Sequence, residues 1–503
     1  MGRVYSPLRA MVPAPATRVR LLRDAAPRRD GDYVLYWMIM NRRPGWNFAL
    51  QHAVAWAERL ERPLLVLEPL RCDYPWASDR FHRFIIDGMR DNARAFEGRG
   101  VRYLPYVEPS LGEGKGLLAA LAARAALVVT DDFPAFMIPR MTEAAAARVA
   151  TRFEAVDSNG IYPMRATETV FPTAYAFRRH LQRALHQHLR EFPAADPLTG
   201  VRLPAPPPVA PEFAARWPAA TSGVLAGDRA SLAALPLDHS VGPVETPGGS
   251  AAGAAALERF VNARLDRYPE DRNEPGRDGT SRLSPYLHFG HVSAHQVFDA
   301  VARHEDWSEA RLAARATGKR TGWWGVSEAA EAFLDQLITW RELGFNFCAH
   351  RSDYDRYESL PDWARRTLEK HQRDPRPHVY AVDDLEAART HDPLWNAAMT
   401  QLKREGWFHK YMRMLWGKKI LEWSPTPRDA LAAMIHLMDK WSLDGRDPNS
   451  YTGYFWTLGR YDRAWGPERP IFGTIRYMSS DNTARKLDVK EYLRRYAGPP
   501  SPP

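Results

Sequence analysis

At 503 residues the chain is too long for one ordinary hydrophobic core and is expected to form two domains with connecting segments. Its 45% hydrophobic and 26% charged residues exclude a largely disordered chain, and the lack of any run of about 18 apolar residues excludes a membrane-spanning helix. The formal charge of +9 favours a polyanionic partner such as nucleic acid, although a basic protein without an acidic partner has the same charge. The two cysteines, Cys72 and Cys348, lie far apart, so we expect no disulfide framework and no metal site, and a reducing, cytoplasmic location.

The first 162 residues divide into a basic leader and an alternating pattern of strands and helices. Residues 1–30 are expected to be a flexible leader; Met1-Gly2 with Ser6 formally matches a myristoylation signal, a pattern that also arises by chance. Apolar runs predict strands at 33–38, 63–67, 101–107, 126–130 and 153–157, and helical spacing predicts helices at 46–60, 80–95 and 116–124. This alternation predicts an α/β domain over 31–162 with a doubly wound parallel sheet. No glycine-rich dinucleotide fingerprint follows the first strand.

The rest of the chain is a connector followed by a second, mainly α domain. Proline-rich clusters mark residues 163–250 as an interdomain connector that carries one helix at 174–190. Residues 251–497 show helical spacing near 254–267, 292–304, 327–348, 359–371, 393–404, 408–422 and 427–441. Residues 498–503 are expected to form a tail.

Six motifs in the second half carry a family resemblance. They are Thr280-Ser-Arg-Leu-Ser-Pro-Tyr-Leu-His-Phe-Gly290, Trp340-Arg-Glu-Leu343, Thr390-His-Asp-Pro-Leu-Trp-Asn396, Tyr411-Met-Arg-Met-Leu-Trp-Gly-Lys-Lys-Ile-Leu-Glu-Trp423, Leu443-Asp-Gly-Arg-Asp-Pro-Asn449 and Ile475-Arg-Tyr-Met478. In this order, between about residues 255 and 495, the motifs resemble the class II cyclobutane pyrimidine dimer photolyases of the photolyase/cryptochrome superfamily. The resemblance implies FAD in the helical domain, damaged DNA with a flipped-out pyrimidine dimer as partner, and action as a monomer. The N-terminal domain resembles the antenna domain of that family less closely, and a second chromophore such as a deazaflavin is the corresponding expectation.

The resemblance implies a cofactor-binding set with sensible chemistry. Hydroxyl groups before a helix suit a pyrophosphate, because backbone N–H groups and the helix dipole favour anions there, whereas carboxylates accept hydrogen bonds from a flavin ring edge and from ribose. A helix cap and a turn would explain the same residues without a ligand. The set is Tyr268, Thr280, Ser281, Arg282, Leu283, Ser284, Asp444, Asp447 and Asn449.

Three tryptophans are candidates for electron transfer. Trp416 and Trp423 are seven residues apart, so they share one helix face, and such a stripe alone is more often core packing. The resemblance implies that an electron hops along them to photoexcited flavin, with Trp416 nearest the flavin, Trp395 intermediate and Trp423 distal.

A separate set is implied for DNA. A flipped-out base needs flat apolar walls and cationic groups for the phosphates. Trp340 and Trp456 match the walls and Met414 the floor. The arginines that match DNA-facing positions are Arg272, Arg413, Arg463 and Arg476, although for any single arginine a surface ion pair is the ordinary explanation.

Three positions depart from the family pattern. Gln336 stands where the family has a glutamate that hydrogen-bonds the dimer, and an amide can donate a hydrogen bond but no proton. Met438 stands where class II photolyases place an asparagine beside flavin N5, and Trp407-Phe-His-Lys410 replaces a smaller, glycine-containing turn. We interpret the sequence as that of a light-driven enzyme that splits pyrimidine dimers. The alternatives are a photolyase-like photoreceptor or repurposed light-dependent flavoprotein without dimer repair, and a nucleic-acid-binding flavoprotein whose light chemistry is vestigial.

Overall fold

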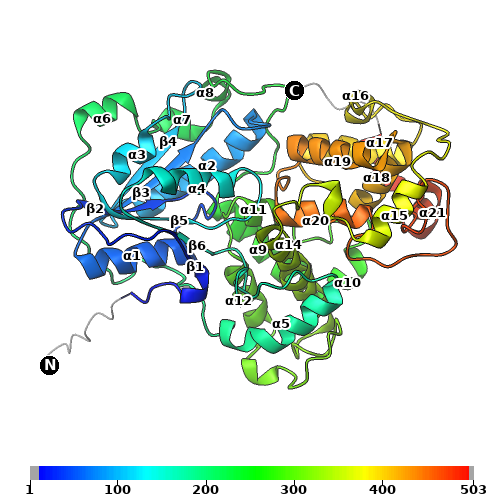
Figure 1. The fold of residues 1–503 in the computed structure, drawn as a ribbon, viewed down its shortest axis with the longest axis horizontal. Helices are drawn as coiled ribbons and strands as arrows, with labels where there is room; N and C mark the ends of the chain where they lie inside the picture. The colour runs from blue at the N-terminus through cyan, green and yellow to red at the C-terminus, as the bar shows by residue number, and fades with distance from the viewer. Residues whose placement is uncertain (1–10, 498–503) are drawn as a thin grey trace.

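A six-stranded sheet forms the N-terminal domain in a computed structural model that describes residues 11–497 (Figure 1). The strands are β1 (Val19–Arg23), β2 (Tyr33–Trp37), β3 (Leu64–Leu70), β4 (Val101–Val107), β5 (Ala125–Asp131) and β6 (Arg152–Val156). Their order is β1-β6-β5-β2-β3-β4; β2 to β6 are parallel, and β1 is antiparallel to β6. The doubly wound parallel sheet predicted from the sequence is therefore confirmed, with an added antiparallel edge strand.

The added strand corrects the flexible leader predicted over residues 1–30. Residues Val19–Arg23 pair with β6, and the preceding Arg18 is buried and donates hydrogen bonds to the carbonyls of Gly160 (3.1 Å) and Ile161 (2.6 Å). An edge strand is half solvated, and here Arg20 and Arg23 interrupt the apolar residues, so the strand lacks the apolar run that marks a central strand. Residues 1–10, with Gly2 and Ser6, and the predicted tail at 498–503 lie outside the described residues.

Helices cover both faces of the sheet, as doubly wound connections require. Helix α1 (Phe48–Leu60) packs on one face, against a cluster that includes Val34 and Val66, and α3 (Leu117–Ala122) packs on the other, against Leu35 and Val128. Helix α2 (Asp79–Phe96) follows β3, and α4 (Ile138–Arg148), which the sequence pattern did not predict, follows β5.

The connector is more ordered than its proline content predicts. It contains α5 (Ala174–His188), α6 (Pro211–Arg216), α7 (Ser222–Ala226) and α8 (Arg229–Ala233). Figure 1 shows α5 beside the helical domain and α6 to α8 beside the sheet domain, so the connector spans both domains.

The second domain is almost wholly helical, which confirms the predicted class. Its α-helices are α9 (Ser250–Ala263), α10 (Tyr268–Asp271), α11 (Ser284–His288), α12 (Ala294–His304), α13 (Glu328–Leu334), α14 (Arg341–His350), α15 (Asp362–Lys370), α16 (Val382–Glu386), α17 (Pro393–Glu405), α18 (Lys410–Trp423), α19 (Pro427–Trp441), α20 (Pro448–Thr457), α21 (Ser480–Lys486) and α22 (Lys490–Tyr496). Short 3-10 turns lie at η1 (Ala16–Arg18), η2 (Leu265–Arg267), η3 (Glu309–Arg311) and η5 (Tyr357–Ser359). None of the helices between residues 11 and 497 has both the length and the apolar character needed to cross a bilayer.

The helix predicted over 327–348 is interrupted by a π-helical segment, η4 (Asp335–Trp340). Asp335 is held at its start by Arg178 of α5, at 2.7 and 3.1 Å. Such segments are rare and occur frequently at functional sites. This one carries both Gln336 and Trp340, and its wide turn keeps their side chains on nearly the same face.

Residues of the Trp340–Leu343 motif join the two domains. Arg341 donates to the carbonyl of Asn159 (2.7 Å), and the Glu342 carboxylate accepts from the backbone N–H groups of Ile161 (2.7 Å) and Tyr162 (3.0 Å). Burial raises the pKa of Glu342 to about 7, opposed by the same two N–H groups. The motif therefore has a structural function at the domain interface.

A second contact brings the loop after β2 against the segment that begins at Thr280. Asp131 organises that loop by accepting from the N–H groups of Ile39, Met40 and Asn41 at 2.8–3.0 Å. Gly290 lies so close to the loop that a Cβ atom would fall 1.9 Å from the Met40 carbonyl oxygen, and its φ of +72° also favours glycine. The loop fits the helical domain through this close backbone contact.

Candidate functional site

The predicted phosphate-binding segment is a loop followed by a very short helix. Helix α11 begins at Ser284 and has a single turn, so Thr280 and Ser281 precede it. Arg282 points toward α17, where it pairs with Glu405 (2.9 Å) and lies over the ring of Trp407 (3.8 Å). The Thr280 hydroxyl is buried and has no hydrogen-bond partner within residues 11–497, which fits a group that binds an additional polar ligand.

Asp444 is the centre of a buried polar cluster. Its carboxylate accepts hydrogen bonds from Arg413 (2.9 and 3.2 Å) and Ser442 (2.6 Å), and Ser284 is a further partner. Burial raises the pKa of Asp444, but the Arg413 charge and the hydrogen bonds outweigh it and lower the pKa below the ordinary value. The charged carboxylate links α11, α18 and the loop before α20.

This cluster changes the expectation for Arg413, which the resemblance places among the DNA-facing residues. Its guanidinium is engaged by a cofactor-set carboxylate and lies over the ring of Phe408 (5.2 Å). Arg413 therefore contributes to the wall that contains Asp444.

The remaining members of the cofactor set occupy neighbouring elements. Asp447 caps α20 by accepting from the Asn449 N–H (2.8 Å) and also lies 3.2 Å from Nδ1 of the buried His288. Asn449 is exposed, whereas Tyr268 is buried beneath the guanidinium of Arg272 (5.5 Å to the ring centre). Leu283 is buried in the apolar core.

The three tryptophans form a continuous series of ring contacts. Trp395 is stacked with Trp416, with ring centres 6.4 Å apart and planes 4° apart, and it meets Trp423 edge-on at 5.5 Å. The Trp395 indole donates to the Trp416 carbonyl (3.0 Å), whereas the Trp416 indole N–H has no partner among the described residues. Trp395 thus lies between the other two, the order that the resemblance implies.

The outer end of this series is covered. Trp423 is 2% exposed, and its ring is contacted by Tyr380 (5.4 Å) and His391 (5.3 Å). The Tyr380 hydroxyl and His391 Nδ1 are 2.7 Å apart. Neither ring was singled out from the sequence, because both residues lie outside the regular helical pattern.

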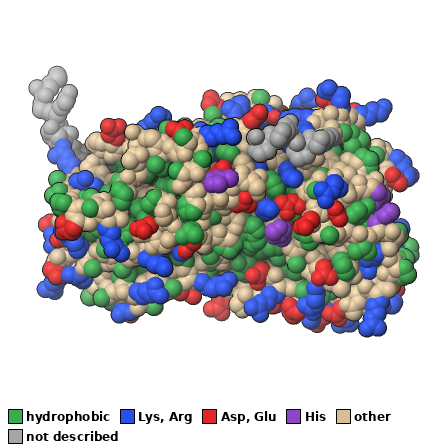
Figure 2. Space-filling view, turned by 90° about the horizontal axis from the view of Figure 1, so that it is seen from above, with side chains coloured by type: hydrophobic (Ala, Val, Ile, Leu, Met, Phe, Trp, Pro, Cys, Tyr) green, Lys and Arg blue, Asp and Glu red, His purple; other side chains and the backbone are tan. Residues whose placement is uncertain are grey.

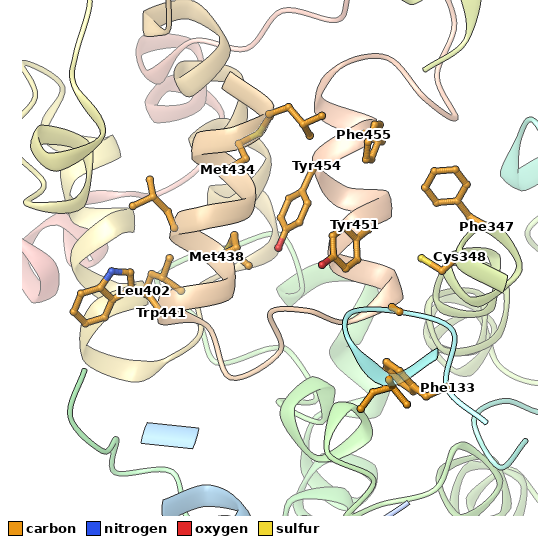
Figure 3. Packing of buried hydrophobic residues seen from close by; sticks show 14 of the residues in the cluster. Phe133, Phe347, Cys348, Leu402, Met434, Met438, Trp441, Tyr451, Tyr454 and Phe455 are labelled. Atoms are coloured by element: carbon orange, nitrogen blue, oxygen red, sulfur yellow. The ribbon is translucent and has the colours of Figure 1, made fainter. Parts of the chain in front are cut away.

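Met438 lies in the core between α19 and α20. It is fully buried, and Figure 3 shows it in the space that separates its helix from Tyr454. The adjacent Asp439 accepts hydrogen bonds from Tyr451 and Tyr454, and burial raises the pKa of Asp439 to about 6. The position of Met438 beside a flavin stays a prediction.

Residues expected to form one wall and the floor of the lesion site are brought together. Gln336 and Trp340 share η4, Met414 is on α18, and all three are partly exposed. Lys410, at the start of α18, donates a hydrogen bond from Nζ to Gln336 Oε1 and so connects the two elements.

The other wall residue belongs to an aromatic and arginine cluster. Arg476 lies 5.8 Å from the ring of Trp456 and 4.1 Å from that of Trp465, and Arg463 lies 4.4 Å from Trp465. Asp462 holds Arg476 at 2.8 Å. Sequence reasoning missed Trp465 and Asp462, although their proximity to two candidate arginines in the chain was a usable signal.

A cavity of about 1120 Å³ lies beyond the carboxyl ends of the parallel strands. Trp37, Tyr106 and Phe133 line it from the sheet domain, and Arg446 and Tyr451 line it from the helical domain. Ligands of doubly wound sheets bind at this edge. This cavity is a second candidate ligand site.

The positive charge is spread over the surface. On the face seen in Figure 2, Lys and Arg side chains are interspersed with Asp and Glu. The net charge of +9 therefore does not by itself locate a nucleic-acid surface.

Structural comparison identifies solved proteins with a similar fold. The chain is similar to a bacterial class III photolyase from Agrobacterium tumefaciens (TM-score 0.63, 16% identity, covering 93% of this chain and 86% of that one). It is also similar to a cryptochrome from Synechocystis (TM-score 0.64, 16% identity, 92% and 88% covered). The fold is thus that of the photolyase/cryptochrome superfamily.

Sequence comparison identifies the family more narrowly. The chain is 34% identical over 487 residues to a deoxyribodipyrimidine photo-lyase of Methanothermobacter thermautotrophicus, covering 96% of this chain and 98% of the relative. It is 33% identical to the deoxyribodipyrimidine photo-lyases of Potorous tridactylus (95% and 84% covered) and Oryza sativa (96% and 91% covered). The chain belongs to the deoxyribodipyrimidine photo-lyase family. No family model matches it.

Proposed function

We propose that this protein is a light-driven, FAD-dependent enzyme that splits pyrimidine dimers in DNA. The observation that carries the proposal is the continuous contact of Trp423, Trp395 and Trp416 in a member of this family. A ring series of this kind serves electron transfer, whereas core packing requires no unbroken sequence of indoles.

The residues of the site have distinct functions in this proposal. Thr280 and Ser284 would hold the phosphates and the polar edge of FAD, together with Asp444, while Tyr268 closes the site. When bound, FAD supplies light absorption and one-electron chemistry. Trp340 and Trp456 provide flat apolar surfaces for the flipped-out dimer, and Arg463 and Arg476 bind the DNA phosphates.

A repair assay tests this function. Purified protein with chemically reduced flavin is mixed with an oligonucleotide that contains one thymine dimer, and the intact thymines are quantified with and without blue light. We expect light-dependent repair that Trp395→Phe retains, because reducing the flavin beforehand makes the tryptophan series unnecessary. Absence of repair in the wild type under illumination would refute the proposal.

The second candidate function is photoreception without dimer repair. It is favoured by Gln336 and Met438, which alter the lesion side and the flavin side of the site. Flavin that responds to light in a protein with equal affinity for damaged and undamaged DNA would support this function.

A second chromophore such as a deazaflavin is proposed for the cavity beyond the sheet. Its size and aromatic lining suit a planar ring system. Reconstitution with a deazaflavin should add its absorption band and allow energy transfer to FAD, and Trp37→Ala should weaken the binding. We further propose action as a monomer in the cytoplasm, in keeping with two buried free cysteines.

A further inference from the structure

Lys410 occupies a corner between the wall and the floor of the lesion site. It shares one face of α18 with Met414, four residues later, and Gln336 shares η4 with Trp340. The hydrogen bond from Lys410 Nζ to Gln336 Oε1 joins these two faces. The amine is therefore next to the surfaces that would contact a flipped-out dimer.

The amine is not occupied by a carboxylate. Within residues 11–497, Lys410 has Gln336 as its hydrogen-bond partner and forms no ion pair. Solvent reaches the side chain, but the surrounding protein is dense, and this desolvation, with the neighbouring charge of Arg272, lowers the pKa of Lys410 to about 8. At neutral pH the group is thus mainly an ammonium with N–H donors left over.

The same hydrogen bond determines the orientation of the Gln336 amide. Because Oε1 accepts from Lys410, the Nε2 hydrogens remain available as donors. The pair consequently presents donors from two side chains, whereas a glutamate in place of Gln336 would present an acceptor when ionised. Pyrimidine carbonyl oxygens are acceptors and match such a pair.

We propose that Lys410 is a lesion-recognition residue, which together with Gln336 donates hydrogen bonds to the carbonyl oxygens of the dimer. This inference rests on the proposed function. The ammonium also stabilises the negative charge that collects on a carbonyl oxygen when the dimer accepts an electron. No net proton transfer is needed: the electron returns after the two carbon–carbon bonds of the cyclobutane ring break, and the amine keeps its proton.

The test separates recognition of the lesion from binding of phosphate. Affinities of the FAD-containing protein for a dimer-containing oligonucleotide and for its undamaged counterpart are measured in the dark by fluorescence anisotropy, at several salt concentrations. Lys410→Met should reduce the preference for dimer DNA about 10- to 100-fold, as expected for a hydrogen bond from a charged group, and leave undamaged DNA unaffected. Lys410→Arg, which keeps the charge and the donors, should retain most of the preference. Lys490→Met, at an exposed position of α22, is the matched control.

Two outcomes would overturn the assignment of Lys410. In the first, Lys410→Met loses affinity equally for both DNAs, and the slope of affinity against salt concentration falls by the amount expected for about one phosphate contact. That result would show that Lys410 binds a DNA phosphate instead of the lesion. An unchanged preference in Lys410→Met would remove it from the site altogether. A wild-type protein that neither prefers dimer DNA nor repairs it would overturn the proposed function as well.

A second pair of variants keeps the inference testable if Lys410→Met folds poorly. With Lys410 present, the carboxylate introduced by Gln336→Glu should pair with the amine and lower the preference for dimer DNA. Combining Gln336→Glu with Lys410→Ala should not restore it, because neither side chain then donates a hydrogen bond to the dimer. An increased preference in the single variant, or a recovered preference in the combination, would contradict the joint function of Lys410 and Gln336.

Discussion

Removal of the Arg413 guanidinium should destabilise the helical domain through Asp444. In Arg413→Met the aliphatic part of the side chain is roughly conserved, but the buried carboxylate loses the partner that binds it at 2.9 and 3.2 Å. Breaking a buried pair costs about 3–5 kcal/mol. Asp444 keeps its hydrogen bonds with Ser442 and Ser284, and the side chain of Arg413 is 22% exposed, so we expect a loss near the lower end, about 3 kcal/mol.

The loss should depend on pH in a defined direction. In the wild type the lowered pKa of Asp444 means that its contribution to stability is present at neutral pH and is lost as the pH falls through that pKa. In the variant, burial without the arginine raises the pKa, so protonation relieves the penalty as the pH falls. The difference in stability between wild type and variant should therefore be largest at pH 7 and smaller at pH 5.

Thermal unfolding measures both effects. For a unit of 150–250 residues, a loss of about 3 kcal/mol lowers the midpoint by about 6–12 °C. Arg428→Met is the matched control, because Arg428 pairs with Glu358 at the surface, where such a pair contributes about 0–1 kcal/mol. A shift no larger than that of the control, or one that is equal at pH 5 and pH 7, would refute the reasoning.

Three further predictions concern the tryptophan series, the domain interface and the π-helical segment. Trp395→Phe should sharply slow the reduction of bound flavin by blue light in the presence of an external reductant. Trp217→Phe, at a tryptophan that directly follows α6 and lies far from the series, should leave the rate unchanged. Equal rates in the two variants would exclude Trp395 from electron transfer. Glu342→Gln should flatten the pH dependence of the unfolding midpoint between about pH 4.5 and 7. In the wild type the pKa of Glu342 is raised to about 7, so its contribution to the free energy of unfolding falls by up to about 3 kcal/mol as the pH rises through this window. An unchanged profile would contradict this reasoning. Arg178→Met should cost about 3–5 kcal/mol by leaving Asp335 buried and unpaired, and a loss matching that of the exposed Arg179→Met would show that the pair does not hold η4.

The fold was predictable where one physical pattern dominated. The central strands are buried on both faces and read as apolar runs, so β2 to β6 were located to within a few residues. Edge strand β1 was missed because one-sided burial leaves no such run. Helix α20 was missed because Asp447 and Pro448 suggested a turn, although an N-capping aspartate followed by proline is also how a helix begins.

The site was predictable as a set of residues and less so as a set of contacts. The order of the three tryptophans followed from the resemblance, but the coverage of Trp423 by Tyr380 and His391 depends on a loop with no periodic pattern. Likewise, the sequence placed Arg413 and Asp444 in separate sets, and only the short distance between them in the structure shows that they are paired. The hydrogen bond between Lys410 and Gln336 likewise could not be predicted, because it joins residues 74 positions apart in the sequence.

The close approach of Gly290 to the loop after β2 has a consequence for engineering. Chimeras that graft the sheet domain of a relative onto this helical domain would have to keep residues 39–43 of the present chain. The Met40 backbone lies against Gly290, and the Arg43 guanidinium donates a hydrogen bond to the Gly290 carbonyl (2.9 Å). A chimera boundary placed in the proline-rich part of the connector would take α5 and its partner Asp335 from different proteins. The contact between the two domains would then be mismatched. The segments that can be exchanged are therefore set by the contacts between the two domains, and these contacts involve several separate parts of the chain.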